Sequence, residues 1–294
     1  MDHRATLLVL LNQRLTTLVD AMPAAQAGDM RSVHQARVAT RRLREALPVL
    51  RVSVDGEEIT RVRRQVRRMT RALGPVRELD VALAHLDELA SQRILSPGAL
   101  TRVRQTIARE RLERRREMLA AITPGKIEKL RRRLGLVGRG PKPLETVAAI
   151  AEAEHQVVRR AATLNAAMER AGSLYLSDRL HAIRVAAKKL RYAMEVEREL
   201  KRSRVTARIT QLKRLQDLLG LMHDYEILIY RTRQMQAEIA GSDRRLSGEL
   251  DALIRTLEDE CRQLHGTYMR RRTSISVLCE RLRAEVDSRT PAVA

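Results

Sequence analysis

The sequence contains no phenylalanine and no tryptophan, and it has only five tyrosines. Leu, Val, Ile, Ala and Met must therefore fill the core, and such aliphatic side chains suit helices that pack side by side. Hydrophobic residues still make up 44% of the chain, which argues against wholesale disorder. The lack of large aromatic side chains also argues against recognition of single-stranded nucleic acid by base stacking.

Cysteine is scarce as well, because only Cys261 and Cys279 are present and they stand far apart. They form no disulfide framework, and the pattern suits a reducing compartment, so we expect a cytoplasmic protein. The apolar run Leu7–Leu11 is flanked by Arg4 and Arg14, and no small-residue cleavage site follows it. We interpret it as part of an amphipathic first helix rather than a signal peptide or a membrane span.

Sequence motifs for common catalytic chemistry are absent. The chain shows no P-loop, no Gly-rich dinucleotide motif, and no Ser/His/Asp or Cys/His arrangement. Signatures of helix-turn-helix, zinc and RNP modules are also missing. These absences favour a binding protein over an enzyme and predict no metal and no cofactor.

Acidic residues are outnumbered, with 36 Asp and Glu against 57 Lys and Arg, which gives a net charge of +21. Such a field attracts anions, and the arginine fork pairs two ways with phosphate oxygens. The alternative explanation is an arginine-rich composition spread over solvated helix faces.

Helical periodicity runs through the whole chain, and no long stretch alternates as a strand would. The fold class predicted is all-α. Gly and Pro residues divide the chain into segments, and the predicted helices cover about 3–21, 31–52, 57–73, a stretch from Pro75, 98–122, 144–171, 175–200, 203–219, 221–240 and 243–285, with a break near Gly266 in the last.

An internal repeat decides the predicted architecture. The segment from His34 to Arg44 returns as the segment from His181 to Arg191, and the block Leu73–Asp80 is echoed by Leu219–Glu226. We predict two homologous antiparallel helical bundles related by a pseudo-two-fold axis. Their ranges are 1–137 and 144–289, with a Gly/Pro linker at 138–143 and a loose tail at 290–294.

Each repeated helix carries cations on one face. At about 100° per residue, His34, Arg37, Arg41 and Arg44 lie within an arc of about 80°, with apolar residues on the opposite side. His181, Arg184, Lys188 and Arg191 form the matching stripe. One such stripe is as well explained by a solvated helix face, but two uncompensated copies with a histidine at the head favour an anion site.

At these residues the sequence resembles the CHAD domain, a family named for conserved histidines in an α-helical domain. The matching motifs are His34-xx-Arg37-xxx-Arg41-Arg42-Leu-Arg44, its second copy, and the two Leu-Gly blocks, so that the resemblance spans about residues 5–285. It implies two helical bundles around a central basic groove that binds inorganic polyphosphate, and some members lie on polyphosphate granules. This chain resembles the members without a CYTH phosphatase domain.

The resemblance also implies the binding residues. They are His34, Arg37, Arg41, Arg42, Arg44 and Arg77 in the first half, and His181, Arg184, Lys188, Lys189, Arg191 and His223 in the second. Second-tier candidates, which a solvated face explains equally well, are Arg64, Arg67, Arg68, Arg71, Lys213 and Arg214.

One block departs from the family pattern. The family's Arg-Asp-x-Asp is here Arg77-Glu78-Leu-Asp80 in one half and His223-Asp224-Tyr-Glu226 in the other. The acidic residues are expected to orient neighbouring cations. We interpret His223-Asp224 as part of an inter-helix hydrogen-bond network rather than a metal-binding pair.

The predicted function is therefore non-catalytic binding of polyphosphate by charge neutralisation, with no membrane association. Two alternatives stay open at this stage: non-specific nucleic-acid binding, which any such surface shows at low salt, and a phosphatase or phosphotransferase acting on polyphosphate. His34 and His181 either add positive charge as the pH falls or cap a hydrogen-bond network at the bundle seam.

Overall fold

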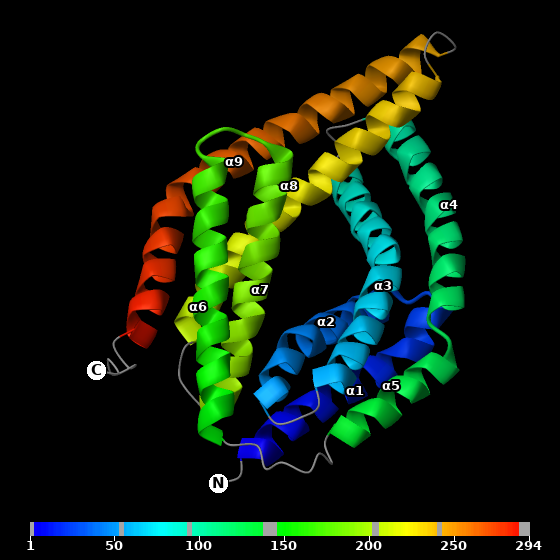
Figure 1. Cartoon of the computed structure of the whole chain (residues 1–294). Coiled ribbons are helices and arrows are strands. Elements are labelled where there is room, and N and C mark those ends of the chain that lie inside the picture. Colours follow the sequence, from blue (N-terminus) through cyan, green and yellow to red (C-terminus); the bar gives the residue numbers. More distant parts are fainter. Residues whose placement is uncertain are drawn as a thin grey trace.

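A computed structural model describes residues 3–52, 56–92, 96–137, 146–201, 206–239 and 243–287. The predicted linker 138–143 and the predicted tail 290–294 lie outside these residues. All regular secondary structure in the described ranges is helical (Figure 1). The elements are α1 (His3–Ala27), α2 (Met30–Ala46), η1 (Leu47–Val52), α3 (Gly56–Ser91), α4 (Pro97–Ala121), α5 (Pro124–Val137), α6 (Thr146–Ala171), α7 (Ser177–Lys201), α8 (Thr206–Glu238) and α9 (Arg244–Asp287).

Local signals explain several helix ends. Gly28 adopts a positive φ of 103° after α1, and the Asp29 side chain then caps α2 by accepting a hydrogen bond from the Ser32 amide at 2.7 Å. Pro97 opens α4 at a position where a missing amide hydrogen costs little. Gly172, with φ 62°, follows the end of α6.

Two predicted helix breaks are wrong. Gly74 and Pro75 lie inside the continuous helix α3, and Gly220 lies inside α8. A buried apolar stripe continues across each glycine, from Leu73 to Val76 in α3 and from Leu219 to Met222 in α8. Tertiary packing on both sides of the glycine therefore overrides its weak helix propensity.

Three further boundaries differ from the sequence-based expectation. Helix α1 continues to Ala27 with Pro23 inside it, and α9 passes Gly266 without a break. Helix α5 was not predicted, because the predicted helices left residues 123–143 unassigned. Pro is well tolerated in a first helical turn, which is where α5 places it.

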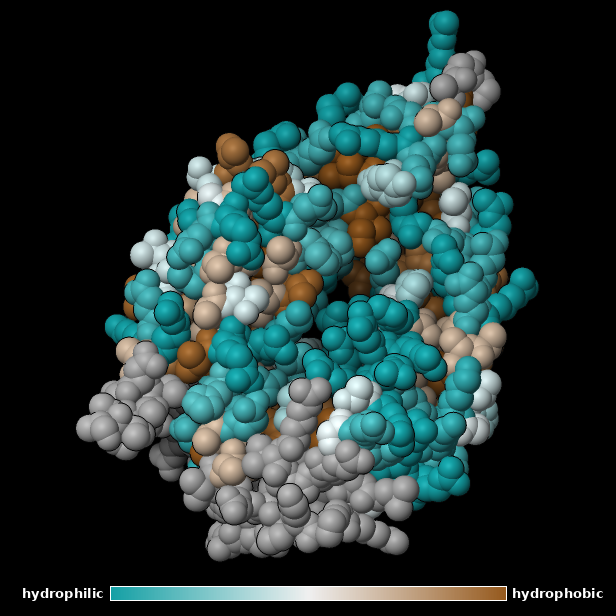
Figure 2. Space-filling view, in the orientation of Figure 1, coloured by the Kyte–Doolittle hydropathy of each residue, from teal (hydrophilic) through white to brown (hydrophobic). Residues whose placement is uncertain are grey.

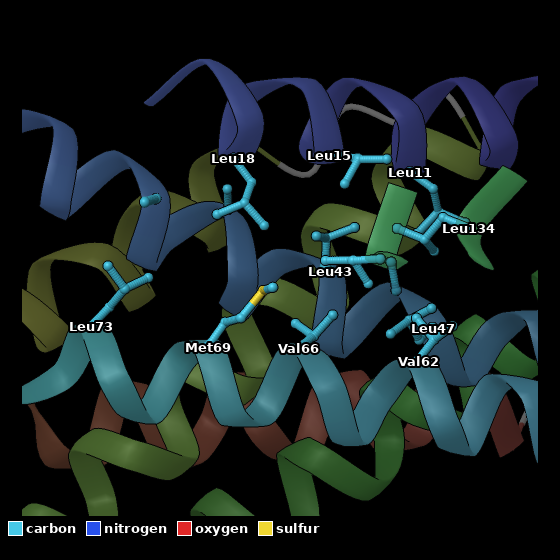
Figure 3. Close-up of a cluster of buried hydrophobic side chains, with 14 of the residues drawn as sticks. Leu11, Leu15, Leu18, Leu43, Leu47, Val62, Val66, Met69, Leu73 and Leu134 are labelled. Carbon is cyan, nitrogen blue, oxygen red and sulfur yellow. The ribbon is translucent and has the colours of Figure 1, made fainter. Parts of the chain in front are cut away.

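Three hydrophobic clusters form the core. The first joins α1, α2, α3 and α5 with η1, the end of α4, the start of α6 and the end of α7, and Leu11, Leu43 and Leu73 are among its members (Figure 3). The second joins α6, α7, α8 and α9. The third joins the later parts of α3 and α8 with α4 and α9. Helices α3 and α8 thus each begin in the core of their own half and end in a shared one.

Helices α2 and α7 occupy corresponding places. Helix α2 packs between α1 and α3, α7 packs between α6 and α8, and α2 and α7 also contact each other. In Figure 1 the two halves enclose the middle of the molecule, where α2, α3, α7 and α8 come together. Within the described ranges, every helix is too short or too polar to span a lipid bilayer.

Candidate anion-binding site

The two cationic stripes are brought together by the contact between α2 and α7. The side chains of Arg37 and Arg41 on α2 and of Arg184 and Lys188 on α7 are all half-buried rather than fully solvated. The cationic stripes were expected to face away from the bundles, and the contact between α2 and α7 partly covers them.

Arg37 and Arg184, which are equivalent in the repeat, each lie close to a glycine of the neighbouring helix. Arg37 Nη1 donates a hydrogen bond to the Thr70 carbonyl at 3.1 Å, and it would lie 2.9 Å from a Cβ at Gly74. The Arg184 guanidinium would lie 3.7 Å from a Cβ at Gly220. Gly74 therefore leaves room for Arg37, a role that the interpretation of Gly74 as a helix stop missed, whereas a Cβ at Gly220 would make only an ordinary van der Waals contact with Arg184.

Six side chains act on one another electrostatically, and together we call them the central cluster. Burial and then Arg41 and Arg184 lower the pKa of Arg37 to about 10. Burial, and then Arg77, Arg37, Arg41 and Lys188, lower the pKa of His34. The members of the central cluster are His34, Arg37, Arg41, Arg77, Arg184 and Lys188.

Lys188 lies deepest among these cations. Burial lowers its pKa to about 6, and the guanidinium groups of Arg184, Arg41 and Arg37 act in the same direction. Neither Arg41 nor Lys188 forms an ion pair with any residue that the structure describes. Burial and the neighbouring guanidinium groups thus shift Lys188 toward its neutral form, and an anion placed beside it would favour the protonated form.

Two more predicted residues adjoin the cluster. The imidazole rings of His181 and His223 lie 4.5 Å apart between centroids. Burial lowers the pKa of His181, and His223, Arg184 and Lys188 contribute to the same shift. With the central cluster, these rings bring eight of the twelve predicted binding residues into one region.

The acidic residues of the second Leu-Gly block, Asp224 and Glu226, contact side chains at the edge of the central cluster. Asp224 Oδ1 lies 3.7 Å from Arg184 Nη2, and Asp224 Oδ2 lies 3.7 Å from His85 Nε2. Glu226 accepts hydrogen bonds from the Tyr175 hydroxyl at 2.6 Å and the Ser177 hydroxyl at 2.7 Å. This arrangement agrees with the expected orienting role.

In the first half, Asp80 has a different partner. It is buried and accepts a hydrogen bond from Arg111 Nε of α4 at 2.5 Å. Arg111 also donates to the Gly28 carbonyl at 2.7 Å. Asp80 thus ties α3 to α4 and to the α1–α2 turn.

Arg42 and Arg191 lie outside the central cluster and pair with Glu195. The sequence alone did not predict this partner. Glu195 is buried, and its carboxylate lies 3.2 Å from Arg42 Nε and also pairs with Arg191 Nη1. Arg191 Nε further donates to Gln216 at 2.9 Å. These two arginines link α2, α7 and α8.

Arg44 and Lys189 lie in a neighbouring basic region. Burial lowers the pKa of Arg44, and Arg41, Arg63 and Arg67 act in the same direction. Burial also lowers the pKa of Lys189, followed by the effect of Arg160. Arg44 thus extends the central cluster toward α3, and it brings the second-tier residue Arg67 with it.

The other second-tier residues are spread over three places. Arg71 lines a cavity of about 560 Å³ beside Arg37 and Gly74. Arg64 and Arg68 line a separate cavity against α5. Lys213 and Arg214 are exposed on α8 outside the cluster.

No metal centre is evident around His223 and Asp224. Among the described residues, no group of three or more His, Cys, Asp and Glu side chains is arranged to hold a metal ion. His223 stacks near His181, while Asp224 points to Arg184 and His85.

The space-filling view shows a hollow with hydrophilic residues on its rim (Figure 2). It lies between the surface formed by α7 and α8 and the surface formed by α3. In the same orientation, α2, α3 and α7, which supply the central cluster, border the middle of the molecule (Figure 1). The arrangement can neutralise several negative charges of an extended anion at once.

Solved structures with a similar fold include two that cover nearly the whole chain. PptA from Streptomyces chartreusis matches with a TM-score of 0.62 and 14% identity, over 91% of this chain and 98% of that one. The CHAD domain from the plant Ricinus communis matches with a TM-score of 0.59 and 18% identity, over 97% of this chain and 91% of that one. No curated protein matches this chain.

The sequence model of the CHAD domain matches residues 10–233. This range includes α2, α3, α7 and the Leu-Gly part of α8, and therefore every residue of the central cluster. The match and the shared fold together show that this chain belongs to the CHAD domain family.

Proposed function

We propose that this chain binds inorganic polyphosphate at the central cluster without hydrolysing it. The observation that carries the proposal is the convergence of cations from α2 and α7, two helices far apart in sequence, on one half-buried region. Arg184 and Asp224 form the one ion pair of the cluster within 4.0 Å among the described residues. The excess positive charge calls for an anionic ligand.

Polyphosphate suits this surface because the polymer is flexible and evenly charged, and because it carries no nucleobases that a protein would have to recognise. Arginine forks would grip its non-bridging oxygens, and the release of bound counterions would make affinity fall steeply with salt. Since α2 and α7 lie on either side of the cluster, one polymer engaged by α2 is presented to α7 at high effective concentration.

The pseudo-two-fold relation between the halves is part of the proposal. It is supported by the pairing of Arg37 with Gly74 and of Arg184 with Gly220, which match in the repeat. The packing of α2 between α1 and α3, and of α7 between α6 and α8, supports it too.

We assign the chain a binding role because the carboxylates around the cluster already have partners. Asp224 is shared between Arg184 and His85, and Glu226 accepts from Tyr175 and Ser177. Phosphoanhydride hydrolysis usually needs carboxylates that hold a metal, or a strong nucleophile. A cytoplasmic location, with association to polyphosphate granules, belongs to the same proposal.

The test is competition between long-chain polyphosphate, RNA and double-stranded DNA near physiological salt, with phosphate release followed in the same samples. Polyphosphate is expected to displace both nucleic acids and to stay intact, in metal-free and in metal-treated preparations alike. Equal competition by nucleic acid would make the charge generic. Release of phosphate would identify an enzyme.

The site assignment has its own test. Replacing Arg37, Arg41, Arg184 and Lys188 by Ala together is expected to abolish polyphosphate binding with the helical circular dichroism retained. The matched control removes four exposed arginines elsewhere, Arg255, Arg270, Arg281 and Arg283 on α9. If the control loses as much affinity as the cluster variant, the binding is not localised.

A further inference from the structure

A second basic cavity lies on the other side of α3, against α5. It has a volume of about 490 Å³, within the range of about 300–1,000 Å³ that small-ligand sites occupy. In Figure 2, hydrophilic residues cover much of the surface over α5. Of the nine described residues that line the cavity, six are Lys or Arg and none is acidic: Arg61, Arg64, Gln65, Arg68, Met69, Ala121, Lys126, Lys129 and Arg133.

Three of these cations have no partner among the residues that the structure describes. Arg61 pairs with Glu57 at 2.7 Å and with Glu58 at 3.4 Å, and Arg133 lies 3.5 Å from the same Glu58 carboxylate. Lys126 Nζ donates to the Ala121 carbonyl at 2.9 Å. In the part of the chain that the structure describes, Arg64, Arg68 and Lys129 make neither a hydrogen bond nor an ion pair.

The cavity is separate from the central cluster. Arg63 and Arg67 act on Arg44 and so lie on the cluster side of α3. At about 100° per residue, Arg64 and Arg68 each lie about 100° further around the helix than these neighbours, and they line the cavity against α5. Adjacent arginines of α3 therefore serve two different surfaces.

We propose that the cavity between α3 and α5 is a second anion site, which takes a compact ligand bearing several phosphate groups. The side chains of Arg64, Arg68 and Lys129, which have no partner among the described residues, supply the positive charge, and Glu57 and Glu58 hold Arg61 and Arg133 beside them. A depression of this volume has room for a short oligophosphate or a phosphate ester of a small molecule, and its exposed rim leaves the site open to solvent.

The experiment titrates tripolyphosphate into the Arg37, Arg41, Arg184 and Lys188 quadruple-alanine variant by calorimetry near physiological salt. One binding site is expected to remain. Adding Arg64→Ala and Arg68→Ala is expected to weaken it at least tenfold, while adding Arg63→Ala and Arg67→Ala, with the same loss of charge on the same helix, changes it by less than twofold. Equal weakening by both pairs, or no remaining site, overturns the proposal.

A reporter in the otherwise unchanged chain gives a second, independent measurement. Ala121 is exposed and lines the cavity, whereas the two native cysteines are buried, so that a fluorophore on Ala121→Cys labels this position. Tripolyphosphate is expected to change its fluorescence, and Arg64→Ala with Arg68→Ala to abolish the response. A response that survives this pair overturns the proposal.

The same reporter separates the two possible ligand sources. Tighter binding of tripolyphosphate than of inositol hexakisphosphate indicates an oligophosphate, and the reverse order indicates a phosphate ester. Because the cavity and the central cluster are tested by different variants, this proposal stands or fails independently of the proposed polyphosphate function.

Discussion

Gly74 and Gly220 occupy equivalent places in the repeat, but they have different surroundings. A Cβ at Gly74 would come within 2.9 Å of Arg37 Nη1, which is closer than real contacts allow. A Cβ at Gly220 would meet Arg184 only at 3.7 Å, an ordinary van der Waals distance. A Cβ at Gly74 would therefore displace the end of the Arg37 side chain, whereas a Cβ at Gly220 fits beside Arg184.

We therefore expect opposite results from two formally identical substitutions. Gly220→Ala should raise the free energy of unfolding by about 0.5–1 kcal/mol, since Ala is the better helix former, and leave polyphosphate affinity unchanged. Gly74→Ala should displace the Arg37 guanidinium from the Thr70 carbonyl and weaken affinity several-fold. Urea unfolding and calorimetric titration measure the two effects, and wild-type affinity in Gly74→Ala would contradict this role of Gly74.

Lys188 makes binding dependent on pH. Its pKa is lowered to about 6 in the free protein by burial and by its cationic neighbours, and those of His34 and His181 are lowered as well. A bound polyanion raises all three, so that binding takes up protons near neutral pH and affinity increases as the pH falls. In the free protein, His34 and His181 therefore gain positive charge only below the usual titration range of histidine.

The measurement is calorimetric titration at pH 7.5 in buffers of different ionisation enthalpy. Proton uptake is expected for the wild type and should fall in Lys188→Met, while Lys213→Met, at an exposed position on α8, serves as the control.

The free energy of unfolding should also depend on pH through Lys188. The unfolded chain keeps Lys188 protonated up to about pH 10.5, so its contribution to stability rises with pH between about 6 and 10.5. Lys188→Met should flatten that rise.

Among the elements, α2 and α7 are joined by a buried carboxylate. Glu195 of α7 accepts from Arg42 of α2 and from Arg191 of its own helix. Removal of such a group leaves two cations without their acid, and breaking a buried ion pair is costly even where the intact pair adds little.

Glu195→Gln is thus expected to lower the free energy of unfolding by about 1–3 kcal/mol. The matched control is Asp259→Asn, whose partner Arg262 and own carboxylate are both exposed, and which should change stability by less than about 0.5 kcal/mol. Chemical denaturation compares the two. A similar effect of both substitutions would show that Glu195 does not join the helices.

The helical faces could be predicted from sequence, whereas the contacts between helices could not. Periodicity placed Arg37 and Arg41 on one face, and the structure confirms it. Arg42 belongs to the same motif, but it lies about 80° from His34 on the helix and turns to Glu195. The pairing with Glu195 depends on how α7 packs against α2, which no local pattern encodes.

Helix ends were the least predictable feature for the same reason. Gly74 and Pro75 have the local character of a break, but buried residues on both sides keep α3 continuous. Helix α5 was missed because the predicted helices left residues 123–143 unassigned. The second basic cavity was missed with it, because three of its nine lining residues, Lys126, Lys129 and Arg133, belong to α5.

For the molecule as a whole, the shared third core fixes the spacing of the two cationic stripes. Helices α3 and α8 run from the separate cores into the shared one, together with α4 and α9. The stripes on α2 and α7 therefore face a common region at a set separation, and they should act on one polymer.

The last prediction separates one shared site from two independent ones. In an Arg64→Ala, Arg68→Ala background, which removes the second cavity, we expect one polyphosphate chain of short defined length per protein chain. Replacing either Arg37 and Arg41, or Arg184 and Lys188, by Ala should keep this stoichiometry. Each pair should weaken affinity and lower the salt slope by roughly 0.7 per lost contact, as for single-stranded polyanions.

Independent sites give a different result in the same titrations. The parent chain would then bind two polymers, and each pair of substitutions would leave one site with its affinity intact. Because Arg41 acts directly on Arg184 and on Lys188 across the α2–α7 contact, a charge removed from one half must change the field felt in the other. Loss of affinity without loss of stoichiometry is the signature of that coupling.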